Sequence, residues 1–362
     1  MGLSVGIAGL PNIGKSTLLN ALTQAGAEAS NYPFCTIEQN VGVAMVPDPT
    51  LSKLAELLQP KETVPAAIRF VDVAGLVAGA SKGEGLGNKF LGHLREVDAI
   101  LHVVRCFEDE NVIHSTGAPD PVRDVEIVET EMLLADLEMA ERAKVRWNNT
   151  VRTGKGDGKE ELSAYTHVVE GLSAGTPVRS LELHDYEERI VVEARFLTFK
   201  PMLYVANTGE DDPHGKGPLT AALRNAKGAD RVVPVSIEIE EEISELPPAE
   251  QRDFIEGLGL DETALDIVVG ASYPLLDLIT FYTIANDKLS ARQIRRGTHA
   301  APAAGKIHSD MERGFIRAEV MALADLFQWK SQQALHDHGL IHVVGRDYEV
   351  QDRDVLHIYF KV

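Results

Sequence analysis

The chain has 362 residues, of which 44% are apolar, so it is long enough for two or three domains with ordinary hydrophobic cores. Its formal net charge of −20 excludes general adhesion to nucleic acid, which requires lysines and arginines that displace counterions from phosphates. Its two cysteines lack C-x-x-C spacing, which excludes a disulfide framework or a cysteine zinc site. No apolar run reaches about 18 residues and the chain begins in a strand-like segment, so we expect a cytoplasmic protein without a membrane span.

The first predicted elements are a buried strand at residues 3–8 and a helix that begins at Lys15. Between them, Gly-Leu-Pro-Asn-Ile-Gly-Lys-Ser-Thr at 9–17 fits the phosphate-binding pattern G-x-x-x-x-G-K-[ST] in its required strand-to-helix context. Its glycines let backbone N–H groups surround an anion, and the helix N-terminus adds a positive end. We therefore predict a nucleoside triphosphate site in which Lys15 reaches the β- and γ-phosphates and the Ser16 hydroxyl binds Mg²⁺.

Two later segments supply further candidate ligands. Thr36 lies in the Pro-broken loop 31–38, where a GTPase-type switch provides a second Mg²⁺ ligand. The apolar run 67–71 ends in Asp72, which a parallel sheet would present at its ligand-binding C-terminal edge. Asp72 is therefore a candidate to hold Mg²⁺ through water, and the N–H of Gly75 is a candidate to meet a γ-phosphate.

Leu76 stands where Ras-type enzymes carry the glutamine that orients the attacking water. Because an alkyl side chain cannot polarise water, we expect either very slow hydrolysis or another group that positions the water. His114, in the polar loop after the buried strand 98–107, is the candidate catalytic group, and a merely solvated histidine is the alternative. The glycine-rich stretch 78–92 is typical of a loop that a γ-phosphate orders.

The strand pattern disappears between residues 124 and 195. Apolar residues recur at three- and four-residue steps from Val125 to Met139 and again from Leu162 to Leu172, on either side of a Gly-Lys hinge. This pattern predicts an antiparallel helical hairpin, followed by a third helix through Tyr186 and Ala194. We interpret the insertion as an arm that docks a partner.

The α/β pattern resumes with strands at 201–206 and 231–237, whose ends carry the residues expected to contact a base. In GTP-binding domains the first strand is followed by an N-K-x-D loop and the second by a small residue, here Ser236. The loop of this chain consists of Asn207, Thr208, Gly209 and Glu210. The longer side chain of Glu210 spoils the bidentate fit to guanine and Asn207 can pair with adenine, so the loop favours ATP.

The remaining sequence has a different pattern of charged and apolar residues. The acidic run 238–245 favours a solvated face, and from about residue 278 short β-like segments surround one predicted helix near 290–295. These segments predict a small α+β domain of the β-grasp type. Residues 288–317 carry seven lysines or arginines against two acids, so a local RNA contact there is a hypothesis.

Six motifs occur in order along essentially the whole chain. They are G-L-P-N-I-G-K-S-T at 9–17, N-Y-P-F-C-T-I-E at 31–38, D-V-A-G-L-V-x-G-A-S-K-G-E-G-L-G-N-K-F at 72–90, N-T-G-E at 207–210, G-F-I-R-A-E-V at 314–320 and V-Q-D-x-D-V at 350–355. Together they resemble the Obg-like ATPase (YchF) family of translation-factor-class P-loop proteins. The resemblance implies an α/β P-loop NTPase G domain with a mostly parallel sheet at 1–128 and 200–277, an inserted helical coiled-coil hairpin at 129–199, and a C-terminal β-grasp (TGS) domain at 278–362.

The resemblance also implies Mg²⁺ dependence, a preference for ATP over GTP and association with the ribosome or a ribosomal subunit. By the family pattern the phosphates are held by Asn12, Ile13, Gly14, Lys15, Ser16 and Thr17. Ser16 and Thr36 hold Mg²⁺, Asn207 and Thr208 hold the base, and His114 is the catalytic histidine. Asn12 is similar to the P-loop residue of relatives that use K⁺, which makes K⁺ a candidate ion.

The leading hypothesis is a slow ATPase that acts as a nucleotide-gated switch on the ribosome. An Obg-type GTPase and a nucleotide-gated binding module with negligible turnover remain the alternatives.

Overall fold

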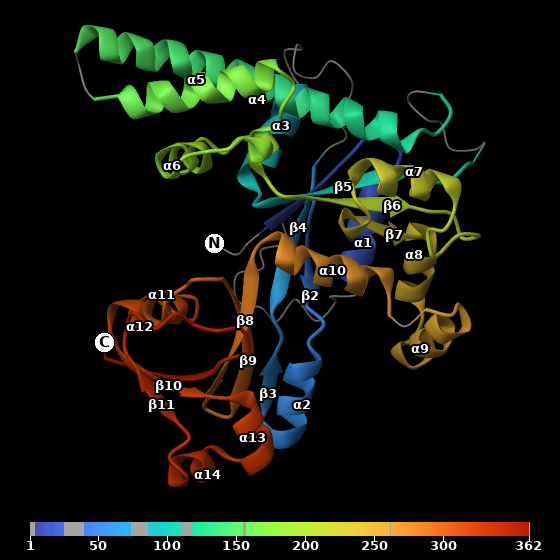
Figure 1. Ribbon diagram of the computed structural model, residues 1–362. Helices are drawn as coiled ribbons and strands as arrows, with labels where there is room; N and C mark the ends of the chain where they lie inside the picture. Colours follow the sequence, from blue (N-terminus) through green and yellow to red (C-terminus); the bar gives the residue numbers. More distant parts are fainter. Residues whose placement is uncertain are drawn as a thin grey trace. The chain divides into compact units, whose positions relative to one another are not determined.

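The computed structural model describes residues 4–24, 40–73, 86–109, 117–154, 157–260 and 262–361 (Figure 1). The chain forms two compact units, which are Met1–Ala44 with Arg69–Val268 and Met45–Ile68 with Val269–Val362. Among the described helices, none combines the length and the apolar character that crossing a membrane requires.

A six-stranded sheet in the order β2-β4-β1-β5-β6-β7 organises the described part of the first unit. The pairs β4–β1, β1–β5, β5–β6 and β6–β7 are parallel. Every residue of β5 and β6 is buried, which explains why these strands read as continuous apolar runs. The strands are β1 (Ser4–Ala8), β2 (Val41–Met45), β4 (Ala67–Asp72), β5 (Ala99–Arg105), β6 (Met202–Asn207) and β7 (Val232–Val235). The predicted mostly parallel α/β fold is thus confirmed.

Helices lie between these strands along the chain or follow the last of them. They are α1 (Lys15–Gln24), α3 (Leu86–Glu96), α4 (Pro121–Thr153), α5 (Lys159–Ser173), α6 (Asp185–Ala194), α7 (Pro218–Lys227), α8 (Ile237–Glu245) and α9 (Pro248–Gly257). Short 3-10 turns lie at Val178–Ser180, Leu197–Phe199 and Ala229–Arg231. A further helix, α10 (Ala264–Leu275), begins in the first unit and ends in the second.

Helices α4 and α5 run antiparallel as a hairpin (Figure 1). The first begins at Pro121 because the Asp120 carboxylate accepts a hydrogen bond from the N–H of Arg123 at 3.1 Å, and it ends at Gly154, which has a left-handed φ of 63°. Apolar side chains of α4, α5 and α6 share one buried cluster that includes Ala143 and Tyr165. The three predicted helices of the arm are therefore present.

A buried carboxylate ties the arm to α3. Asp136 of α4 accepts hydrogen bonds from the N–H groups of Leu197 at 3.0 Å and Thr198 at 2.7 Å, and it pairs with Arg95 of α3 at 3.1 Å. Burial raises the pKa of Asp136, while these donors act against that rise. The chain returning from α6 is thus fixed against both helices.

A mixed sheet in the order β11-β10-β12-β8-β9-β3 organises the described part of the second unit. Its strands are β3 (Glu62–Val64), β8 (Leu278–Ala285), β9 (Lys288–Arg295), β10 (Phe315–Met321), β11 (His342–Val344) and β12 (Val355–Phe360). Its helices are α2 (Pro49–Leu58), α11 (Ala300–Gly305), α12 (Ser309–Arg313), α13 (Leu323–Trp329) and α14 (Gln332–Asp337). One face of the sheet packs with α11, and the other packs with α2, α13 and α14.

The prediction of a helix near residues 290–295 is wrong, because this segment belongs to strand β9. Strand β9 pairs antiparallel with β8 from Leu278↔Arg295 to Ala285↔Lys288. The two residues between the strands, Asn286 and Asp287, have φ of 53° and 59°. Two left-handed residues in succession make the tight turn whose twist matches a β-hairpin, and this turn fixes the register.

Residues 45–68 lie in the second unit, whereas the sequence analysis placed them within domain 1–128. Strand β3 pairs in parallel with β9, and α2 packs its apolar side against the core around Tyr282. Glu62 and Lys288, which form an ion pair at 2.6 Å here, are separated by 226 residues. No local sequence pattern reveals so distant a pairing.

Candidate functional site

The segment between β1 and α1 adopts backbone angles that few residues tolerate. Gly9, Asn12 and Gly14 have φ of 147°, 58° and 90°. A Cβ at Gly9 would stand 2.5 Å from the carbonyl oxygen of Val103, so only glycine fits without displacing β5. This turn leads directly into the N-terminus of α1, where backbone N–H groups lack intrahelical partners. The segment therefore has the form of an anion-binding loop.

Lys15 lies across this loop. The residue is 7% exposed, and its Nζ donates a hydrogen bond to the Leu10 carbonyl oxygen at 2.6 Å. Burial lowers the pKa of Lys15, and the negative charge of Asp72 acts in the opposite direction. An ammonium group buried in this way is placed to meet the charge of a phosphate enclosed by the loop.

Ser16 and Asp72 bring two oxygen ligands together. The Ser16 hydroxyl donates to Asp72 Oδ2 at 2.7 Å, and parallel pairing sets this contact by placing Asp72 opposite Ile7 of β1. The second carboxylate oxygen, Oδ1, is buried without a hydrogen-bond partner in the part of the chain that the structure describes. Hydroxyl and carboxylate oxygens are the ligands that Mg²⁺ prefers, so these residues fit the predicted ion.

Asn207 bridges the loops at the ends of three strands. Its Nδ2 donates to the Ile13 carbonyl oxygen at 3.1 Å, and its Oδ1 accepts from the N–H of Ile237 at 3.3 Å. A Cβ at Gly14 would come within 3.0 Å of the same Nδ2, which explains why the phosphate loop has glycine there. The amide predicted to contact a base thus also joins the phosphate loop to α8, and sequence analysis missed this role.

Two buried hydroxyls lie beside this bridge. Thr208 donates its N–H to the Val235 carbonyl oxygen at 2.9 Å, and Ser236 is the next residue after Val235. Both hydroxyl oxygens are buried, and neither has a hydrogen-bond partner among the described residues. Because buried hydroxyls are normally paired, they are candidates to contact a ligand. Glu210 is exposed.

Four positions that sequence analysis connected with catalysis or metal binding lie outside the described residues. They are Thr36, Gly75, Leu76 and His114. The structure brings Lys15, Ser16 and Asp72 together at the loop, and Asn207 is hydrogen-bonded to the loop through Ile13.

His102 is a buried residue near the loop that sequence analysis did not single out. It lies on β5 opposite Ala8, the last residue of β1 before the loop, and is 1% exposed. Burial lowers the pKa of His102 to about 4. A neutral imidazole is therefore built into the sheet beside the phosphate loop, and the only sequence signal was a histidine inside an apolar run.

Two family models match the chain. A model described as a 50S ribosome-binding GTPase matches residues 4–137, and YchF-GTPase_C, described as a protein of unknown function, matches residues 278–361.

Known relatives extend over the whole chain. Proteins named ribosome-binding ATPase YchF from Bacillus subtilis (strain 168), Haemophilus ducreyi and Escherichia coli O157:H7 are 46%, 47% and 45% identical, with 100% of each chain covered. The solved structure of the Schizosaccharomyces pombe YchF GTPase matches with a TM-score of 0.88 and 33% identity, covering 99% of this chain and 98% of that one. The phosphate loop, the sheet and these full-length matches agree, and the chain belongs to the YchF family.

Proposed function

We propose that this protein binds and slowly hydrolyses ATP with Mg²⁺, and that the bound nucleotide controls its attachment to the ribosome. The observation that carries the proposal is the cluster at the phosphate loop, where Lys15 is buried and the Ser16 hydroxyl lies 2.7 Å from the Asp72 carboxylate. Relatives named ribosome-binding ATPase support a nucleotide-dependent function on the ribosome.

In this proposal the loop itself binds the phosphates. The backbone N–H groups of residues 12–17 and the Lys15 ammonium hold the β- and γ-phosphates. Ser16, Asp72 and Thr36 would hold Mg²⁺, which would supply positive charge against the phosphate oxygens. Asn12 makes K⁺ a candidate additional ion, which a comparison of hydrolysis in KCl and NaCl would test.

Positioning and charge neutralisation carry most of the catalysis in this scheme, and Leu76 in place of a glutamine accounts for slow turnover. His114 is the proposed group that orients the attacking water. His114→Ala should lower single-turnover hydrolysis while leaving ATP affinity unchanged. Equal loss of affinity and rate would assign His114 a structural role instead.

ATP is the proposed nucleotide because the base loop carries Thr208 and Glu210 where a guanine-reading loop carries lysine and aspartate. The buried hydroxyls of Thr208 and Ser236, which have no hydrogen-bond partner within the described segments, support contacts to a base at this position. The S. pombe relative is named a GTPase, so the preference needs a direct comparison. Titration with ATP and GTP side by side should give tighter ATP binding, and a guanine preference above about tenfold, roughly 1.4 kcal/mol, would overturn the proposal.

Lys15→Ala tests the phosphate site itself. Removal of the ammonium should abolish ATP binding and hydrolysis, whereas parental hydrolysis by this variant would refute the assignment. Single-turnover hydrolysis with and without ribosomes then separates the enzyme from a binding module. Product in either reaction supports the enzyme, and no product in both supports the module.

The ribosome contact is proposed to involve the arm at 129–199 and the β-grasp region at 278–362. The basic stretch 288–317 is the proposed local RNA contact. Four of its basic residues already pair with carboxylates, and these pairs are Lys288–Glu62, Arg296–Asp277, Arg313–Asp310 and Arg317–Glu319. An RNA contact there should weaken steeply between low and high salt, and a flat salt response would exclude it.

A further inference from the structure

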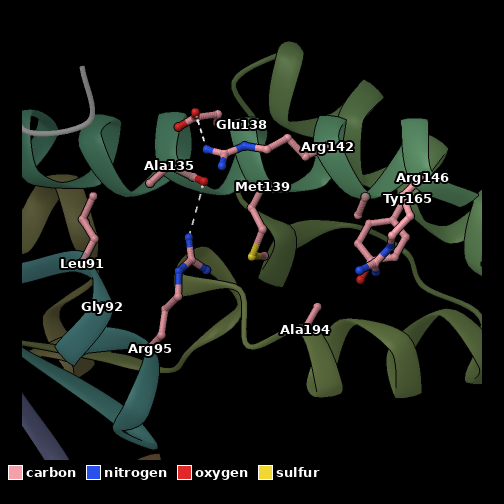
Figure 2. Close-up of a pocket in the computed structure, with 11 residues that line it drawn as sticks. Leu91, Gly92, Arg95, Ala135, Glu138, Met139, Arg142, Arg146, Tyr165 and Ala194 are labelled. Carbon is pink, nitrogen blue, oxygen red and sulfur yellow. Dashed lines mark hydrogen bonds and ion pairs between the residues drawn. The ribbon is translucent and has the colours of Figure 1, made fainter. Parts of the chain in front are cut away.

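A cleft of about 650 Å³ lies among the helices of the first unit, apart from the phosphate loop (Figure 2). Leu91, Gly92 and Arg95 of α3 line one side, and Tyr165 of α5 and Ala194 of α6 complete it. The remaining lining residues come from α4 and are Ala135, Glu138, Met139, Arg142, Ala143 and Arg146. Figure 2 shows Met139 directed from α4 into the space above Ala194.

The cleft is elongated along α4. Its α4 residues follow one another at steps of three, one, three, one and three, which is a single face of a helix. From Ala135 to Arg146 this face extends over 12 residues, whose 11 steps span about 16 Å at the rise of an α-helix. A three-turn helix matches this length, whereas a compact ligand would contact only part of it.

The floor of the cleft is apolar. The accessible apolar lining comes from Ala135, Met139 and Ala194, which are partly exposed, whereas Leu91, Ala143 and Tyr165 are buried. Met139 supplies a flexible side chain that adapts to different partners. On the α3 side, a Cβ at Gly92 would meet no atom of the described residues within 4 Å, so the described part of the cleft is open there. Such a floor suits an apolar helix stripe, as in other helix-in-groove complexes.

The rim is basic, in contrast to a chain with a net charge of −20. Three arginines line the cleft against a single acid, Glu138. Arg95 is fixed by Asp136, while Arg142 is 72% exposed and pairs with Glu138 in the same helix. Exposed ion pairs of this kind contribute little to stability, so an incoming carboxylate can replace Glu138 as the partner of Arg142.

We propose that this cleft binds an acidic amphipathic helix of a partner protein, with its apolar stripe on the floor and its carboxylates against Arg142 and Arg146. An RNA strand fits the cleft less well. Its bases would need an exposed aromatic ring, yet Tyr165 is only 9% exposed, and its phosphates would leave the apolar floor uncovered.

The test uses a fluorescein-labelled synthetic peptide of roughly 16 residues, with leucines at alternating three- and four-residue steps, glutamates flanking them and alanines elsewhere. Fluorescence anisotropy with the full chain should show saturable binding that weakens as salt rises. Gly92→Leu should fill the cleft and weaken binding at least about tenfold. Arg142→Glu should weaken it at least about fivefold and reduce its salt dependence.

Two control variants make the same chemical changes elsewhere. Arg252 on α9 is exposed and pairs with Glu256 four residues away, so Arg252→Glu reproduces the Arg142 change outside the cleft. Gly270→Leu places leucine at another helical glycine whose Cβ position is open. Neither control should alter peptide affinity, and circular dichroism should show all four variants folded.

Several results would overturn the proposal. They include no saturable binding up to about 1 mM peptide, or equal affinity in the cleft and control variants. A third is displacement of the peptide by a single-stranded oligouridine whose own binding is lost in Arg142→Glu and kept in Gly92→Leu. That pattern would identify a phosphate-binding surface instead.

Discussion

Asn207→Ala, studied without nucleotide, separates the bridging role of this side chain from a role in reading the base. The change removes the hydrogen bonds to Ile13 and Ile237 and leaves two backbone groups without those partners. Each lost hydrogen bond costs about 1 kcal/mol net, and unsatisfied buried groups add to this cost. We therefore expect the free energy of unfolding to fall by about 2–4 kcal/mol. Urea unfolding followed by far-ultraviolet circular dichroism measures it.

Two further variants sharpen the test. Asn207→Asp at pH 7 should cost more than alanine, because a carboxylate oxygen would face the Ile13 carbonyl oxygen where Nδ2 now donates. Thr208→Val should change stability by less than about 0.5 kcal/mol, because its buried hydroxyl has no hydrogen-bond partner among the described residues. The bridging role would be refuted if Asn207→Ala unfolded at the parental urea concentration and altered only the choice between ATP and GTP.

Three other predictions concern the first unit. Since burial holds the pKa of His102 at about 4, below its unfolded value, the free energy of unfolding should be highest above about pH 6.5 and fall toward pH 4. At pH 5 this fall should amount to about 2 kcal/mol, and urea unfolding should show that His102→Gln removes it. Since burial raises the pKa of Glu240 to about 7, stability should fall as pH rises from about 4.5 to 7; Glu240→Gln should remove most of this fall, and equal slopes in both proteins would contradict it. Gly9→Ala should weaken ATP binding at least about 100-fold by titration, because its Cβ would collide with the Val103 carbonyl oxygen. Gly257→Ala, whose Cβ meets no atom of the described residues within 4 Å, should bind ATP normally.

The phosphate site could be predicted from sequence because its chemistry is local. Residues 9–17 are consecutive, and their glycines, lysine and serine each answer a specific geometric need of a bound phosphate. Asp72 could be added because parallel strands deliver their C-terminal residues to one edge. The contact of Asp72 with Ser16 follows from these two facts.

Features that depend on distant partners could not be predicted in the same way. Strand β9 is fixed by the turn at Asn286-Asp287 and by pairing with β8, which outweigh any helical tendency of its own residues. Glu240 belongs to an acidic run that favours a solvated face, yet it is buried and accepts hydrogen bonds from the N–H groups of Ala264 and Leu265 at the start of α10. Only the tertiary structure shows that this side chain is buried and accepts hydrogen bonds at a helix end.

Residues 45–68 emerge from the ribosome long before the strand with which they pair. Glu62 and its partner Lys288 are 226 residues apart, so at about 5–20 residues per second roughly 10–45 s of synthesis separate them. During that interval the apolar side of α2 lacks the core formed with Tyr282 and Leu289. A nascent chain of this protein therefore carries an early hydrophobic segment that must stay shielded from aggregation until translation is nearly complete.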